Sequence, residues 1–484
     1  MMIMQDVVIR LLLLVATACS VASAEHWAVI VAGSRGYWNY RHQADACHAY
    51  HVVRRHGIPA ENVILMMYDD VASAPENPFP GKIFNRPDQG SNGDAVDVYA
   101  GCHVDYRGDD VTPDMFLSVL LGDDNATKGR KVLNATAEDR VFINFVDHGA
   151  DGVLLFPDDG MLRAKQLLKT LQQMHFQKRY KELVFYVEAC ESGSMFHDDD
   201  MRKINVFVTT AASASESSYG TFCPPMDVVN GTALGTCLGD LYSVNWMEDS
   251  DLTDLSGETL QQQYRTVKEQ TNLSHVLQFG SKQVRREIVG NFQSNYDQAP
   301  EDASSSDDEE TTMSNSPESP LDSHSIGAIS SRDVDLVLTF YRYLRSASGP
   351  KRQKLAQELI QVIEQREQSD RIFERIRSTY QKTVGVELIR LPIATTQLPS
   401  DCQDRVLRAF EQHCGLKGDA NIGSGFSSYS LKYLSILNDL CGALDDDSAI
   451  EDILRLSCEP LVGDNLKSSP SDEALTTSDL IAVE

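Results

Sequence analysis

The chain has little positive charge: it holds 43 Lys and Arg residues against 71 Asp and Glu, for a formal net charge of −28. Nucleic acid is bound through basic surfaces, so this balance argues against nucleic acid as a partner. A metal cluster with sound ligand spacing is also missing. His48 and His51 lie close together, but both fall on a helix that packing already explains. We therefore expect no metal and no cofactor.

Long apolar runs are missing as well, apart from one near the N-terminus. There Arg10 precedes the run Leu11–Ala16, and Ala22-Ser23-Ala24 supplies a cleavage site before Glu25. This arrangement is typical of a secretory signal peptide, and the run is too short to cross a bilayer. We expect residues 1–24 to be removed and the mature protein to carry no membrane span.

Entry into the secretory pathway makes disulfides possible. Cys223 and Cys237 flank a loop rich in Pro and Gly and could close a small ring. Four late cysteines allow three pairings, namely those among Cys402, Cys414, Cys441 and Cys458. Cys47 lies on the apolar face of a predicted helix, so we expect it to be free and buried, and Cys102 is left over.

Four Asn-x-Ser/Thr sequons fit the same route and predict glycosylated surface loops. They lie at Asn125, Asn134, Asn230 and Asn272. The tripeptide Arg107-Gly108-Asp109 is similar to an integrin-binding motif, but a match of three residues carries little weight.

Buried strands alternate with helices over residues 25–296, which predicts an α/β domain with a mostly parallel sheet flanked by helices. The strands are expected at 27–32, 63–68, 141–146, 183–188 and 204–209. Helices are expected at 43–55, from Thr112-Pro113-Asp114 to Leu121, and within Leu154–Met174, where leucines at helical spacing predict a crossover between two parallel strands.

The composition changes after Tyr296. From Asp297 to Asp322 there are nine acidic residues and no Lys or Arg, so we expect residues 297–330 to be an exposed, disordered linker. Residues 331–462 show helical spacing and hold the late cysteines, which predicts a separate all-α domain. Its part 341–390 is locally basic, with eleven Lys and Arg against six Asp and Glu, and residues 463–484 form a tail that we expect to be disordered.

Two of the predicted strands end in residues that carry chemistry. The run Val141–Val146 continues into Asp147-His148-Gly149, and the run Leu183–Val187 continues into Glu188-Ala189-Cys190. Ligands of open α/β sheets collect at the carboxyl ends of the strands. Alone, Cys190 could be a small packing residue and His148 a loop histidine. Their occurrence at matched strand ends favours a thiolate nucleophile with a general base beside it.

These strand ends resemble the His-Gly and Ala-Cys motifs of the caspase-like clan of cysteine proteases. Three longer stretches resemble the legumains, which are asparaginyl endopeptidases and are called vacuolar processing enzymes in plants: Asn39–Tyr50, Glu188–Met195 and Tyr242–Ser250. The resemblance is strong over residues 26–280 and looser over 331–460. It implies a caspase-like sheet followed by a helical prodomain.

The resemblance also implies the catalytic roles. Cys190 matches the nucleophile, His148 the general base, and Asn39 the residue that orients the histidine ring. An imidazole can take and return protons near working pH, and an amide can hold the ring without adding charge. Backbone N–H groups of Gly149 and Cys190 would stabilise the oxyanion.

The family cuts after asparagine, whose carboxamide both accepts and donates hydrogen bonds. Arg41 matches the donor to its oxygen, whereas Glu188 and Asp240 match the acceptors for its NH₂ group. The matching lining residues are His42, Ser217, Ser218 and Tyr219. Without the family, Arg41 would be interpreted as part of a surface salt bridge. Such a pocket predicts weak cleavage after aspartate at acidic pH.

The resemblance further implies a zymogen of the lysosome or vacuole, or one that is secreted. The helical prodomain would cover the active site until acid weakens the attraction between its basic run and the acidic catalytic domain. We expect self-cleavage in the linker, with Asn315 as the best site and Asn291, Asn295 and linker aspartates as rivals.

Two other functions remain open. The same residues would serve a transpeptidase, or peptide ligase, in which an amine instead of water resolves the acyl-enzyme. A non-enzyme alternative is an inactive homologue that binds cystatin-like inhibitors. The motifs do not separate hydrolase from ligase, whereas the presence of both Cys190 and His148 argues against an inactive protein.

Overall fold

A computed structural model describes residues 24–88, 95–158, 160–295, 324–325, 327–389, 400–414, 426–444 and 446–459. The predicted signal peptide, most of the acidic linker with Asn315, and the tail lie outside the described residues. The chain divides into two compact units. The first runs to Ile363 and includes Gly418–Lys432, and the second contains Glu364–Ile393, Leu398–Lys417 and Tyr433–Glu484.

A six-stranded sheet in the order β13-β8-β7-β3-β1-β2 forms the centre of the first unit. Its strands are β1 (His26–Ala32), β2 (Val63–Met66), β3 (Arg140–Val146), β7 (Glu182–Glu188), β8 (Val206–Thr210) and β13 (Leu277–Gly280). Only the edge pairing of β13 with β8 is antiparallel. Every residue of β1, β3 and β7 is buried, as expected for parallel strands covered on both faces. The predicted mostly parallel α/β sheet is confirmed.

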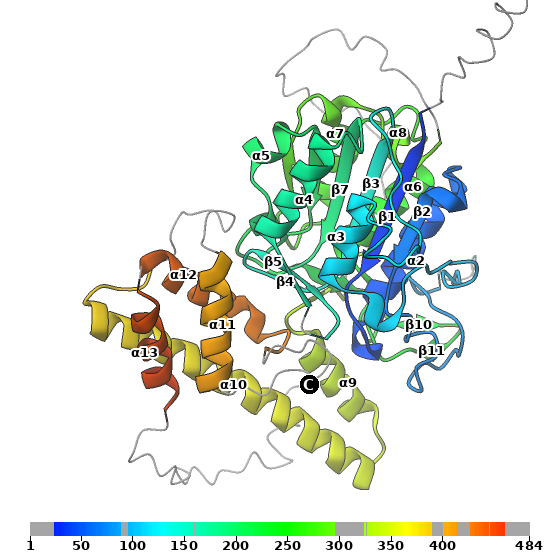
Figure 1. The fold of residues 1–484 in the computed structure, drawn as a ribbon. Helices are drawn as coiled ribbons and strands as arrows, with labels where there is room; N and C mark the ends of the chain where they lie inside the picture. Colours follow the sequence, from blue (N-terminus) through cyan, green and yellow to red (C-terminus); the bar gives the residue numbers. More distant parts are fainter. Residues whose placement is uncertain are drawn as a thin grey trace, which may run out of the picture. The chain divides into compact units, whose positions relative to one another are not determined.

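Helices cover the sheet on both sides (Figure 1). One core lies between the sheet and α2 (Tyr40–Arg55), α6 (Leu241–Leu252), α7 (Leu260–Gln270) and α8 (Gly290–Gln293). The other core lies against α3 (Pro113–Leu121), α4 (Ala164–Phe176) and α5 (Asp198–Arg202). Successive residues of β1 alternate between the two cores, with Ala28 and Ile30 in the first and Val29 and Val31 in the second.

The helix that was predicted from Thr112 begins as expected. Thr112 accepts the main-chain N–H of Met115 as the N-cap, and Pro113 occupies the first turn. The crossover between β3 and β7 is different from the prediction, because α4 starts only at Ala164. Residues 153–163 form a hairpin of β5 (Val153–Phe156) and β6 (Gly160–Arg163), in which Leu162 pairs with Leu154. Pro157 and Gly160 flank its turn and interrupt the leucine spacing that suggested a longer helix.

Short strands flank the sheet at its functional edge. They are β4 (Gly149–Ala150), β9 (Tyr219–Thr221), β10 (Val228–Val229), β11 (Thr232–Ala233), β12 (Gly239–Asp240) and β14 (Ile329–Ser330). In the order β12-β9-β14, three of them form a sheet of their own.

The chain after residue 331 is helical, as predicted. Its helices are α9 (Val334–Arg345), α10 (Pro350–Val384), α11 (Ser400–Cys414), α12 (Leu434–Ala443) and α13 (Asp447–Cys458). In the second unit, Phe373 of α10 stacks on Phe410 and on Tyr433, with ring centroids 5.1 Å and 4.5 Å apart. The domain boundaries proposed from the sequence remain a prediction.

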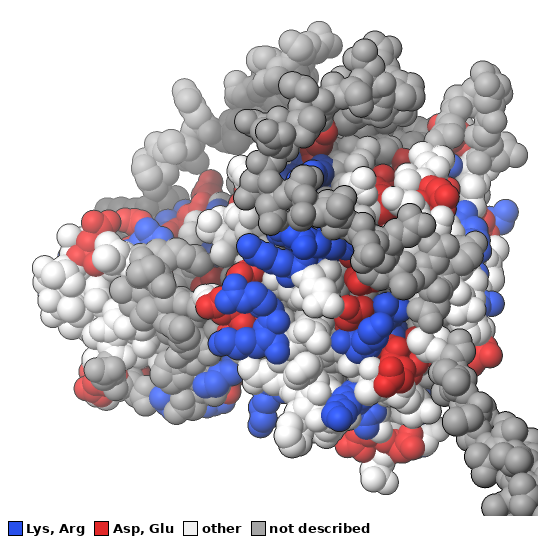
Figure 2. Space-filling view, turned by 90° about the horizontal axis from the view of Figure 1, so that it is seen from above, with Lys and Arg blue, Asp and Glu red and all other residues white. Residues whose placement is uncertain are grey.

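Surface charge and helix length agree with the composition. On the face shown in Figure 2, Lys and Arg side chains lie between Asp and Glu side chains, so neither sign of charge covers that face alone. Among the described residues, no helix is long and apolar enough to cross a membrane.

Four disulfides are present in the described part of the chain. Three join candidate cysteines: Cys223–Cys237, Cys402–Cys441 and Cys414–Cys458. The fourth joins Cys47 to Cys102, so the expectation of a free Cys47 is wrong. Helical spacing identified Cys47 as buried, but it carries no information about a partner 55 residues away that the loop after Val98 brings against α2. Cys190 is the free cysteine of the described residues.

Removing the Cys47–Cys102 bond should destabilise the first unit. With a sequence separation of 55 residues, loop-closure entropy predicts a loss of roughly 2–4 kcal/mol for the double variant Cys47→Ala/Cys102→Ala. Urea unfolding at acidic pH measures this, with both proteins in a Cys190→Ala background and Cys190→Ala alone as the reference. An unchanged unfolding midpoint would contradict a stabilising role.

Candidate active site

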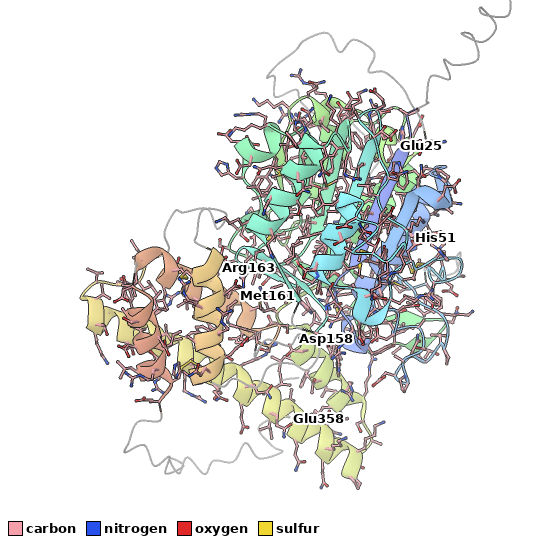
Figure 3. All side chains as sticks on the ribbon, in the orientation of Figure 1. Glu25, His51, Asp158, Met161, Arg163 and Glu358 are labelled. Atoms are coloured by element: carbon pink, nitrogen blue, oxygen red, sulfur yellow. A yellow bond between two sulfur atoms is a disulfide. The ribbon has the colours of Figure 1, made fainter. Side chains whose placement is uncertain are left out.

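Three adjacent parallel strands deliver the predicted catalytic residues to one edge of the sheet. His148 follows the end of β3 by two residues, and Cys190 follows the end of β7 by two. Asn39 ends a short 3-10 helix (Tyr37–Asn39) after β1. Figure 3 shows Glu25, which precedes β1, at one edge of the sheet, and Asp158, from the β5–β6 turn, at the opposite edge, where the strands end.

Asn39 fixes the ring of His148. Its Oδ1 lies 2.8 Å from His148 Nε2, while its Nδ2 donates to the Arg35 carbonyl at 2.9 Å. The second bond sets the orientation of the amide, so His148 Nε2 carries the proton and Nδ1 keeps its lone pair. Burial, with smaller effects from Arg41 and Arg332, holds the pKa of His148 well below its usual range. The ring is therefore neutral and can act as a base.

Cys190 is buried and lies beside the strand that begins at Tyr219. The main-chain N–H of Ser218 donates to Cys190 Sγ at 3.4 Å, and the Ser218 hydroxyl lies 3.8 Å from the same sulfur. Burial raises the pKa of the Cys190 thiol, an effect that Arg332 opposes and Glu191 adds to. In this state the sulfur is a thiol, the less reactive form.

Gly149 lies directly against the nucleophile. A Cβ atom at this position would come within 2.4 Å of the Cys190 carbonyl oxygen and 2.9 Å of Ala189 Cβ. Any side chain here would push the Cys190 backbone away. The absence of one lets the main chains after β3 and β7 approach closely.

Arg41 and Asp240 form a buried ion pair beside this site. Arg41 Nε donates to Asp240 Oδ1 at 2.8 Å, and each side chain is 1% exposed. The interpretation of Arg41 as part of a surface salt bridge is therefore wrong. Glu188 is equally buried, and its Oε2 accepts from the main-chain N–H of Ser243 at 3.0 Å.

Each of these three side chains keeps one polar atom without a hydrogen-bond partner among the described residues. They are Arg41 Nη2, Glu188 Oε1 and Asp240 Oδ2. Buried polar atoms are nearly always satisfied, so three orphaned atoms in one place indicate room for a polar ligand. One donor and two acceptors complement a carboxamide, which has one acceptor oxygen and two N–H donors.

His42 lies between the pocket and the catalytic histidine. Its Nδ1 is 2.6 Å from Ser34 Oγ and 3.2 Å from Asp147 Oδ1, and its ring centroid is 5.0 Å from that of His148. Ligand atoms of His42, Asp147 and His148 all lie within 4.8 Å of one another, a grouping that the sequence did not suggest. The hydrogen bonds to Ser34 and Asn39 account for the two ring positions, so we assign no metal. Ser217 and Tyr219 are half-buried nearby in the chain.

A short segment beyond the linker lies on the active-site edge, and sequence reasoning missed it. Strand β14 pairs antiparallel with β9, Ile329 opposite Gly220 and Ser330 opposite Tyr219. The Ser331 N–H then donates to the Ser218 carbonyl at 2.9 Å. Two-residue strands give no periodic signal, so no pattern in the sequence could have found this pairing.

Arg332 follows that strand and is 4% exposed. It donates to the Gly149 carbonyl at 2.7 Å and to the Ser428 carbonyl at 2.7 Å, and it forms an ion pair with Glu191. These contacts cover the residues on both sides of the nucleophile.

A buried thiol, a neutral imidazole and an amide that orients it, placed where parallel strands end, define a cysteine-dependent hydrolase. The chain matches the Peptidase C13 family over residues 26–295. Legumain from Mus musculus is 42% identical over 424 residues, which cover 87% of this chain and 89% of that protein. The vacuolar-processing enzyme beta-isozyme from Arabidopsis thaliana is 38% identical over 444 residues, covering 89% and 86%. The chain belongs to the peptidase C13 (legumain) family and is a cysteine-type asparaginyl endopeptidase.

Buried carboxyl groups make the stability of the fold depend on pH. Burial, together with the neighbouring Asp249 carboxyl, raises the pKa of Glu258 from its ordinary 4.5 to about 8. A raised folded-state pKa means that the folded protein holds the proton more tightly than the unfolded chain. This contribution to stability is complete below about pH 4.5 and is lost as the pH rises through about 8. Burial likewise raises the pKa of Glu188 well above its usual range.

We therefore expect the Tm to fall between pH 4.5 and pH 8, and the variant Glu258→Gln to reduce this fall because glutamine has no proton to lose. Thermal unfolding across this range measures the effect in a Cys190→Ala background. The control is Glu138→Gln, at an exposed position. Identical Tm–pH curves for Glu258→Gln and the reference would refute the assignment.

Proposed function

We propose that this protein cleaves peptide bonds after asparagine, with Cys190 as nucleophile and His148 as general base. The observation that carries the proposal is the set of three orphaned polar atoms, one donor and two acceptors, buried beside Cys190. The asparagine oxygen accepts from Arg41 Nη2, and its NH₂ group donates to Glu188 and Asp240. An aspartate carboxylate has no proton to donate, so it fits only when acid protonates it.

The chemistry follows from the hydrogen bonds of the site. His148 Nδ1 takes the thiol proton, and Cys190 Sγ attacks the carbonyl carbon of the asparagine residue. The N–H groups of Gly149 and Cys190 are the proposed donors to the resulting oxyanion. His148 returns the proton to the leaving amine, and water then hydrolyses the thioester. Asn39 keeps the ring in the tautomer that this sequence needs.

Reporter peptides that differ only in the residue before the cleaved bond test the specificity. After acid incubation we expect cleavage of the Asn peptide at pH 4 and pH 7, and weak cleavage of the Asp peptide at pH 4 that is at least tenfold lower at pH 7. A Cys190→Ala control should show neither. Equal Asp cleavage at both pH values would refute the carboxamide pocket, and mass analysis with an added amine separates hydrolysis from peptide ligation.

We also propose that the protein is made as a zymogen. The support is the pairing of Ile329–Ser330 along the strand beside Cys190, together with the ion pair between Arg332 and Glu191. A second pair joins Arg345 of α9 to the buried Asp227 at 3.5 Å. Acid protonates carboxylates and so weakens such pairs, which would free the edge for substrate.

The activation cleavage remains a prediction, since Asn315 lies outside the described residues. Of its rivals, Asn291 is fully buried in α8 and bonds to Glu287, which makes it a poor substrate, whereas Asn295 is exposed. Exposed sequon asparagines at 125, 134, 230 and 272, and four disulfides, support passage through the secretory pathway. We propose a lysosomal or vacuolar location, and cystatin-like inhibitors as partners remain an untested expectation.

The variant Arg332→Ala should lose latency more easily, because it removes the ion pair with Glu191 and both carbonyl contacts. Incubation of the uncleaved protein from pH 4 to pH 7 should show activity against the Asn reporter at a pH about one unit higher than for the wild type. The matched control is Arg408→Ala, at an exposed position. An unchanged activation pH for Arg332→Ala would argue against the clasp.

A further inference from the structure

A buried carboxyl group behind the pocket has no part in the chemistry described so far. Asp45 lies one helical turn after Arg41 on α2, so both side chains project from the same face of the helix. It is 0% exposed. Its Oδ2 accepts the main-chain N–H of Asp240 at 3.1 Å, and its Oδ1 accepts from Asn85 Nδ2 at 2.6 Å.

Asn85 continues this chain of hydrogen bonds toward the surface. Its Nδ2 also donates to the Leu238 carbonyl at 3.0 Å, so its Oδ1 faces His48 Nδ1 at 2.7 Å. His48 Nε2 in turn lies 2.9 Å from Asp251 Oδ2, on α6. The pocket strand packs tightly on the chain: a Cβ at Gly239 would lie 2.8 Å from Asn85 Nδ2 and 3.0 Å from Asp45 Oδ1. Asp45 is thus held from behind and holds Asp240 in front.

The charges around Asp45 do not balance if every group is ionised. Asp45, Asp240 and Glu188 would contribute three negative charges, against the single guanidinium of Arg41, in a site with almost no exposure. Isolated buried charges are costly, so neighbouring carboxyl groups of this kind share protons.

Burial and the Asp240 carboxyl raise the pKa of Asp45 well above its usual range. The pKa of Asp240 is raised by burial too, but the adjacent Arg41 opposes that rise. The ion pair with Arg41 therefore favours the proton on Asp45 and the charge on Asp240. A protonated Asp45 is within side-chain hydrogen-bonding reach of the Asp240 carboxylate.

We propose that Asp45 is a positioning residue of the carboxamide pocket. It holds the main-chain N–H of Asp240 and shares one proton with the Asp240 carboxyl group, so that Asp240 meets the substrate as a hydrogen-bond acceptor. This role rests on the proposed cleavage after asparagine. When Asp45 loses its proton at higher pH, two adjacent carboxylates repel each other and the acceptor moves. Because Asp45 has no hydrogen bond to Cys190 or His148, the consequence falls on KM and not on kcat.

The variant Asp45→Asn tests the shared proton, because an amide can donate to the Asp240 carboxylate and cannot ionise. Kinetics with the Asn reporter are measured from pH 5 to pH 7.5, with active enzyme counted by an irreversible thiol reagent. In the wild type we expect KM to rise about fivefold or more over this range. In Asp45→Asn we expect KM to change less than twofold, with kcat within threefold of the wild type at each pH.

Two further variants keep the test decisive. Asp45→Ala removes both hydrogen bonds and should raise KM about tenfold at every pH, whereas Asp114→Asn, at an exposed position, should follow the wild type. If the Asp45 variants do not fold, Asn85→Ala should raise KM with kcat within threefold, because it removes the anchor behind Asp45. An unchanged KM in Asn85→Ala would overturn the proposal.

Parallel KM–pH curves for wild type and Asp45→Asn would overturn the proposal, as would a loss confined to kcat. Failure of the proposed function itself looks different, since the wild type would then not prefer the Asn reporter over matched Gln and Ala reporters.

Discussion

Arg41 Nε and Asp240 Oδ1 meet at 2.8 Å where both side chains are 1% exposed, and much of the site depends on that contact. Arg41 comes from α2, which packs on the sheet, and Asp240 comes from β12, which pairs with β9 and leads into α6. The pair therefore ties the floor of the pocket to the strand beside Cys190. Loss of either partner would leave a buried charge uncompensated, at a cost of about 3–5 kcal/mol.

Burial has a second consequence, which is a low reactivity of the catalytic pair in this state. It lowers the pKa of His148 and raises that of Cys190, so the two residues form a neutral pair instead of a thiolate and an imidazolium. The segment Ile329–Arg332 contributes to that burial, because it pairs with the strand beside the sulfur and bonds to Gly149. Occupation of the edge and a resting nucleophile are thus two effects of one arrangement, consistent with a latent enzyme.

How far sequence reasoning reached depended on the range of each signal. The apolar runs at 141–146 and 183–188 predicted β3 and β7 to within a residue, because side chains that are buried on both faces leave a continuous pattern. The same reasoning extended the crossover helix back over the β5–β6 hairpin, since leucines at 154 and 162 fit a helix as well as a paired turn. It also treated Cys47 as free, because burial is visible in a local pattern whereas a partner at Cys102 is not.

The sequence by itself determined the α/β class, the placement of His148 and Cys190 at neighbouring strand ends, and the residue types of the pocket. All of these follow from local periodicity and from motifs that stand within a few residues of one another. Only the tertiary structure decided that Arg41 is buried, that Asp45 and Asn85 stand behind Asp240, and that Ile329–Arg332 lies on the active-site edge. Those facts depend on contacts between residues far apart in the chain and on the removal of water from charged groups, and both arise only when the chain is folded.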